Sequence, residues 1–88
     1  MKRAHHPNAF LTLIRNYTRG LVARTGILSV LERGIANAKA IAQKTGLKYG
    51  TVLYHLHLLE SEKILRVGEK KPYVWEVTGA GQQRLANL

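Results

Sequence analysis

One stretch of the chain decides its fold: residues 37–63, which read NAKAIAQKTGLKYGTVLYHLHLLESEK. Asn37 precedes a compact, alanine-rich helical pattern. Thr45-Gly46 marks the end of that pattern, since glycine readily takes the left-handed backbone that stops a helix. A longer helical pattern then follows over residues 49–62. A short helix, a glycine-bearing turn and a longer helix together predict a helix-turn-helix unit.

The second helix of this unit is predicted to have two different faces. Val52, Leu56 and Leu59 share one side, and Gly50, Tyr54, His57 and Ser61 point the opposite way. In a helix-turn-helix the second helix enters the DNA major groove, which is about 12 Å wide. Tyr54, His57 and Thr51 are therefore expected to contact base edges or phosphates, and Gly50 to permit close approach. Lys48 stands at the helix start, where the helix dipole favours a phosphate.

A β-hairpin is predicted after this helix. Residues 64–67 and 73–77 are rich in β-branched and aromatic types, and residues 68–72 supply turn chemistry. Lys70 and Lys71 at the tip are expected to lie on phosphates or enter the minor groove, with Arg66 joining them. Trp75 is predicted to belong to the core, and a stacking role on a nucleobase is left open for Tyr73.

The N-terminal part is predicted to contain two helices. Phe10, Ile14, Tyr17 and Leu21 recur at spacings of four, three and four, which indicates a helix over about residues 8–23. Thr25-Gly26 is interpreted as a break. A second helical stripe follows over residues 27–35, with Gly34 as its C-terminal cap. At the other end of the chain, Thr78 is expected to cap a last short helix that reaches Leu88.

Residues 46–60, GLKYGTVLYHLHLLE, resemble the recognition helix of winged-helix regulators of the ArsR/MarR-like class, especially compact archaeal members. Residues 77–85 are similar to the exit of their wing, T-x-x-G-x-x-x-L. The resemblance spans residues 25–88 and implies a winged helix that binds DNA, with an added terminal helix as the dimer interface. In this chain Lys48-Tyr49-Gly50 replaces a small polar triplet, which leaves fewer side chains for base readout.

Charge supports the same function. Lysine and arginine number 14 against 5 acids, for a net charge of +9. Residues 1–24 carry five of these cations and no acid. Such a field attracts polyanions, of which nucleic acid is the commonest inside cells.

Other function classes find little support in the residues. The chain has no cysteine, which excludes disulfides and thiolate metal sites. His55 and His57 diverge around a helix, so no metal site and no cofactor are expected. The acids form no paired-carboxylate pattern, and catalysis is not expected. No apolar run approaches the roughly 20 residues of a membrane span, and a cytoplasmic location is expected.

Together these observations predict an α+β, mainly α, winged helix-turn-helix with an extra N-terminal helix and a two-stranded wing. Residues 1–24 are expected to form a basic helix that makes a homodimer, and residues 25–88 the DNA-binding domain. The expected function is transcriptional regulation on double-stranded DNA. Two alternatives remain: an architectural protein that coats DNA with low specificity, and a protein-interaction module. The predicted DNA-binding residues are Lys48, Tyr49, Gly50, Thr51, Leu53, Tyr54, His57, Arg66, Lys70 and Lys71.

Overall fold

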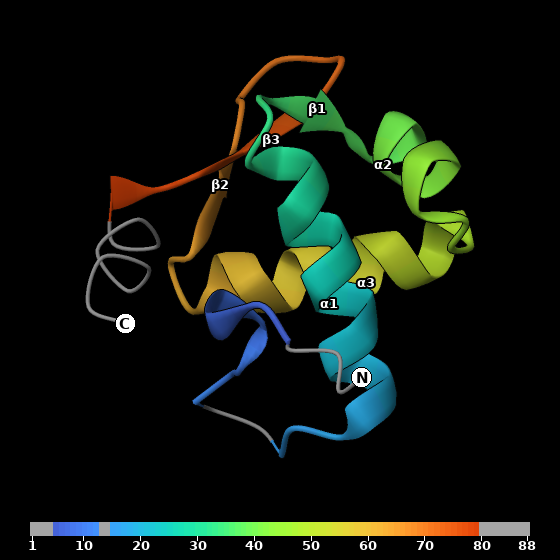
Figure 1. Ribbon diagram of the computed structural model, residues 1–88. Helices are drawn as coiled ribbons and strands as arrows, with labels where there is room; N and C mark the ends of the chain where they lie inside the picture. The colour runs from blue at the N-terminus through green and yellow to red at the C-terminus, as the bar shows by residue number, and fades with distance from the viewer. Residues whose placement is uncertain (1–4, 13–14, 80–88) are drawn as a thin grey trace.

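The computed structural model describes residues 5–12 and 15–79, and within them the fold is mainly helical (Figure 1). In chain order the elements are a 3-10 turn η1 (Pro7–Ala9), helix α1 (Thr18–Leu31), strand β1 (Ala36–Asn37), helices α2 (Ala38–Thr45) and α3 (Tyr49–Ser61), and strands β2 (Leu65–Val67) and β3 (Val74–Val77). This order confirms the predicted winged helix-turn-helix architecture.

The sheet is antiparallel, with β3 between its two neighbours in the order β1-β3-β2. Trp75 of β3 lies opposite Ala36 on one side and Val67 on the other. Strands β2 and β3 agree with the predicted hairpin to within a residue at each end. Strand β1 was not predicted, because a strand of two residues is too short to show the alternation that identifies one.

The helix-turn-helix has the expected local chemistry. The side chain of Asn37 caps α2, its Oδ1 accepting a hydrogen bond from the Ala40 backbone N–H at 2.8 Å. Gly46 ends α2 with φ = 76°, in the left-handed region that glycine occupies without steric cost. Helix α3 ends one residue before its predicted limit. The α2-turn-α3 unit was therefore predictable from local sequence.

The core lies where α1, α2, α3 and the sheet meet. Helix α3 contributes buried residues at the spacings expected of one helical face, and Trp75 of β3 belongs to the same core cluster. Each large apolar side chain that is fully buried contributes about 1.5–3 kcal/mol. Trp75 is buried, so the prediction that it belongs to the core is confirmed. The most deeply buried apolar side chains are Ile27, Leu28, Ile41, Val52, Leu56, Leu59, Ile64 and Leu65.

The predicted helix over residues 8–23 is wrong. Among the described residues before Thr18, the 3-10 turn at Pro7–Ala9 is the only helical segment, and Tyr17 has extended backbone. Phe10 and Tyr17, two members of the proposed stripe, are 43% and 65% exposed. Their spacing was coincidental, and no separate N-terminal helix is present among the described residues before α1.

The predicted break at Thr25-Gly26 is also wrong, since α1 runs through it to Leu31. Leu21, Leu28 and Leu31 form one continuous buried stripe across the proposed break. Burial of that stripe outweighs the roughly 1 kcal/mol that a glycine costs inside a helix. The expected domain boundary after residue 24 consequently falls inside α1.

The segment before α1 is anchored to the helical body. The Thr12 backbone N–H and its hydroxyl both donate to the Glu62 carboxylate just after α3. His6 pairs with Glu32 at the end of α1, and its backbone N–H donates to Thr25. Figure 1 shows this segment, in blue, beside the C-terminal end of α3.

The short helix expected after Thr78 lies almost wholly outside the described residues, which end at Gly79. Among the helices that are described, none has the length and apolar character needed to cross a membrane.

Candidate nucleic-acid interface

Helix α3 has one buried side and one open side, as predicted. Val52, Leu56 and Leu59 are fully buried. On the opposite side Gly50, Tyr54 and His57 are exposed, with Tyr54 at 59%. The protein's own atoms therefore leave the outer face of α3 free to meet a partner.

The start of α3 is open and has no acidic residue in its first turn. Lys48 occupies the N-cap position with extended backbone and makes no side-chain cap. The first N–H groups of a helix lack intrahelical partners and attract anions. Nothing lies within 4 Å of the position that a Cβ on Gly50 would take. Lys48 and this exposed turn thus offer a positive, accessible helix end.

The wing presents its lysines and pairs its arginine. Lys70 and Lys71 are exposed in the tip between β2 and β3. Arg66 lies directly opposite Glu76 across the strands, and its Nε donates to that carboxylate. The predicted phosphate contact by Arg66 would therefore compete with an existing ion pair, whereas the two lysines have no such neighbour opposite them in the strand register.

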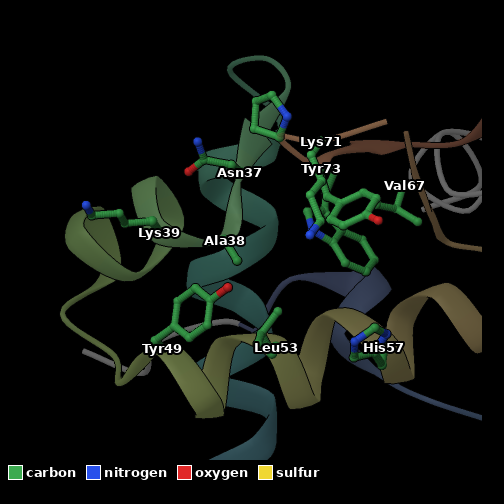
Figure 2. A pocket seen from close by; sticks show the side chains of 11 residues that line it. Asn37, Ala38, Lys39, Tyr49, Leu53, His57, Val67, Lys71 and Tyr73 are labelled. Carbon is green, nitrogen blue, oxygen red and sulfur yellow. The ribbon is translucent and has the colours of Figure 1, made fainter. Parts of the chain in front are cut away.

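A groove runs between α3 and the wing. Figure 2 shows Tyr49, Leu53 and His57 in a row along α3, facing Tyr73 and Val67 across the hollow. The His57 ring meets the Trp75 ring edge-to-face at 5.4 Å between centroids. The hollow has a volume of about 870 Å³. Its lining residues are Asn37, Ala38, Lys39, Tyr49, Leu53, His57, Val67, Lys71, Pro72, Tyr73 and Trp75.

Behind α3 lies a buried polar cluster centred on Arg24 of α1, which is 2% exposed. Its Nε donates to the Ala9 carbonyl at 2.6 Å, and one Nη donates to Asn16 Oδ1 at 3.2 Å. The other Nη is 3.3 Å from His55 Nδ1. Because a guanidinium only donates, His55 Nδ1 must accept and therefore carries no proton.

This cluster affects the protonation of both groups. Burial lowers the pKa of His55, and the neighbouring Arg24 charge lowers it further. Burial also lowers the pKa of Arg24, while the charges of Glu62 and Tyr54 act in the opposite direction. His55 is thus held neutral on the buried side of α3, and the polar cluster ties α3 to α1 and to the N-terminal segment.

The structure separates the predicted site residues into three groups. Tyr49, Leu53, His57 and Lys71 come together at the groove. Lys48, Gly50 and Tyr54 lie on the open side of α3, with Thr51 half-buried at its flank. Lys70 stands at the wing tip, and Arg66 lies in the ion pair with Glu76.

Sequence reasoning missed the groove residues that come from elsewhere in the chain. Asn37 and Lys39 at the start of α2 line the hollow, as does Pro72 at the wing, next to Tyr73, for which a stacking role was left open. No local pattern links these positions. The signal available was the aromatic and proline content of residues 72–75, directly after two lysines.

Comparison with solved structures gives two informative neighbours. The first is the Zalpha domain of PKZ from Carassius auratus, solved in complex with Z-DNA. It has 31% identity and a TM-score of 0.60, and the match covers 65% of this chain and 92% of that one.

The second is the homodimeric winged helix-turn-helix DNA-binding domain of Mb0332 from Mycobacterium bovis, a possible ArsR-family transcriptional regulator. It has 26% identity and a TM-score of 0.63, and the match covers 72% of this chain and 59% of that one. No protein-family model and no curated protein matches the sequence. Element order, the β1-β3-β2 sheet and these two neighbours establish that the chain belongs to the winged helix-turn-helix domains.

Proposed function

We propose that the chain binds double-stranded DNA and regulates transcription, with α3 in the major groove and the wing along the backbone or in the minor groove. The observation that carries the proposal is the open side of α3, where Gly50, Tyr54 and His57 are exposed beside Lys48. The net charge of +9 and the DNA-binding neighbours support it.

The test measures binding of a labelled duplex by fluorescence anisotropy. Lys48→Ala and Tyr54→Ala are each expected to weaken binding about fivefold or more, which corresponds to about 1 kcal/mol or more. Arg33→Ala is the matched control, because Arg33 is an exposed cation after α1 and belongs neither to α3 nor to its N-cap. Equal affinity of all four proteins would show that α3 is not the contact surface.

Low sequence specificity is a second candidate property, favoured by Gly50. This position is central on the open side of α3 and supplies no side chain for base readout. Competition with random duplex distinguishes a DNA-coating protein from a sequence-specific regulator. A specificity ratio near one favours DNA coating, and a large ratio favours a regulator with defined operators. If no duplex binds the protein, a protein-interaction module is favoured instead.

Recognition of a left-handed duplex is a further candidate, favoured by the 31% identity to a domain solved with Z-DNA. Circular dichroism of an alternating CG duplex reports the handedness of the DNA directly. Inversion of the DNA spectrum on adding the protein would support binding of the left-handed form. An unchanged right-handed spectrum, with binding shown by anisotropy, would exclude it.

Homodimerisation remains part of the proposal, without the separate helix expected for it. Among the described residues of the N-terminal region, the exposed large apolar side chains are Phe10, Tyr17 and Val22, the last on α1. Mb0332 is homodimeric, which favours the same state here. Sedimentation of wild type and of Val22→Glu tests it: a dimer that dissociates in the variant places the interface on this surface.

A further inference from the structure

The groove between α3 and the wing has the chemistry of a small-ligand site. Its volume of about 870 Å³ lies within the range of roughly 300–1,000 Å³ that is usual for such sites. Tyr49 contributes a wall from α3 and Tyr73 one from the wing, and these residues are 54% and 48% exposed. Trp75, which is 3% exposed, also lines the hollow. The hollow therefore offers aromatic surface that is accessible from outside.

The rim of the groove is positively charged. Lys39 lines it at the start of α2 and Lys71 at the wing tip, and among the described residues no acid lines the hollow. Figure 2 shows the two lysines on different elements at the rim, Lys39 on α2 with its side chain directed outward and Lys71 beside Tyr73. An occupant with a flat aromatic part and a negatively charged chain would complement both the tyrosine walls and the rim.

An intact duplex does not have this shape. Its phosphates and base edges face outward, while the flat faces of its bases are covered by stacking. An apolar aromatic hollow gains nothing from base edges, which would lose hydrogen bonds to water on entering it. A base that has left the stack presents its flat face, and aromatic side chains bind such bases with little regard to sequence.

We propose that this groove binds one unstacked nucleobase of a DNA strand, between Tyr49 and Tyr73 and next to Trp75, with Lys39 and Lys71 on the flanking phosphates. The inference deepens the proposed DNA-binding function and rests on it for the approach of the strand. It assigns the groove to unpaired or distorted positions in a duplex, where removing a base from the stack costs least.

The test uses the full chain and three duplexes of one sequence: fully paired, with a single-base bulge, and with an abasic site at the same bulge. The bulged duplex is expected to bind about tenfold more tightly than its abasic counterpart, within the range for stacking of one base. Trp75, the chain's single tryptophan, reports occupancy through a fluorescence change that the abasic duplex does not produce.

Tyr73→Leu removes one aromatic wall and is expected to reduce the tenfold preference to about one. Lys44→Ala is the matched control, since Lys44 is exposed on α2 away from the groove lining, and it should keep the preference. Circular dichroism verifies that both variants fold.

The outcomes separate this inference from the proposed function. If the paired duplex is bound, and the bulged and abasic duplexes bind with equal affinity, only the groove inference is overturned. Binding of only the bulged duplex supports the groove and overturns recognition of the paired duplex. Absence of binding to all three duplexes overturns both.

Discussion

Arg24 is a buried cation whose hydrogen bonds go to neutral groups. It donates to the Ala9 carbonyl and to Asn16, and it lies against His55. A buried charge is costly unless its donors are satisfied. The arrangement therefore holds only while His55 stays neutral, because a protonated imidazole would place a second positive charge beside the guanidinium and remove its acceptor.

The His55 arrangement predicts that stability falls in mild acid. The pKa of His55 in the folded protein is lowered from its ordinary value of 6.5. Between the lowered pKa and 6.5 the unfolded chain binds more protons, so the free energy of unfolding rises with pH there. It should decline as pH falls below 6.5, by at most about 1.4 kcal/mol per pH unit from this group.

Urea unfolding of wild type and His55→Gln over this pH range measures the effect. The difference between their unfolding free energies should shrink as pH falls, because glutamine has no proton to gain. Parallel pH profiles for the two proteins would contradict the assignment of a neutral His55.

Lys63 is a second residue under local constraint. It has φ = 62° just after α3, where its N–H bonds to the Glu60 carbonyl at 2.8 Å and the next N–H, of Ile64, bonds to Leu59 at 3.0 Å. This pattern is a Schellman motif, in which glycine is the usual residue. Lys63→Gly should therefore raise the free energy of unfolding by about 1 kcal/mol. Thermal unfolding measures the change. Lys63→Ala keeps a Cβ in the left-handed region and should not show this rise in stability.

At the scale of elements, prediction succeeded where local signals agree with tertiary packing. Asn37 and Gly46 bound α2 as their chemistry requires, and the apolar face of α3 is the face that the core buries. In α1, however, the Thr25-Gly26 pair was given more weight than the continuous stripe Leu21–Leu28–Leu31. The groove was not predictable, because three distant segments meet there and no local pattern records their meeting.

The two glycines of α1 differ in their surroundings, which gives an element-scale prediction. A Cβ on Gly26 would be 3.6 Å from Thr45 Cγ2, an ordinary contact, so Gly26→Ala should stabilise α1 by about 0.5–1 kcal/mol. A Cβ on Gly20 would be 2.7 Å from an Nη of Arg24, which its hydrogen bonds hold in place. Gly20→Ala should therefore destabilise the protein. Melting temperatures of the two variants test this, and a gain in both would mean that the Arg24 side chain shifts freely.

At the scale of the whole molecule, the positively charged side chains differ in how freely they can bind a polyanion. The acids are largely engaged: Glu32 with His6, Glu60 with His57 and Glu76 with Arg66. Glu76 thereby neutralises Arg66, a permanent cation, whereas Lys48, Lys70 and Lys71 lie outside these pairs and are exposed, as are Arg33, Lys39 and Lys44 elsewhere on the surface. DNA affinity should consequently depend on which cation is removed, beyond the change in net charge.

Salt dependence separates these cations. Each phosphate neutralised by a protein cation contributes about 0.9 to the slope of log affinity against log salt concentration. The double variant Lys70→Ala/Lys71→Ala should lower the slope by about two if both lysines lie on phosphates. Arg66→Ala should lower it by much less than one, because Glu76 already neutralises that guanidinium. Anisotropy titrations of one duplex over about 50–200 mM salt measure the slopes. A full unit lost in Arg66→Ala would mean that the ion pair opens on DNA, and the wing would then reach the backbone along β2 as well as at its tip.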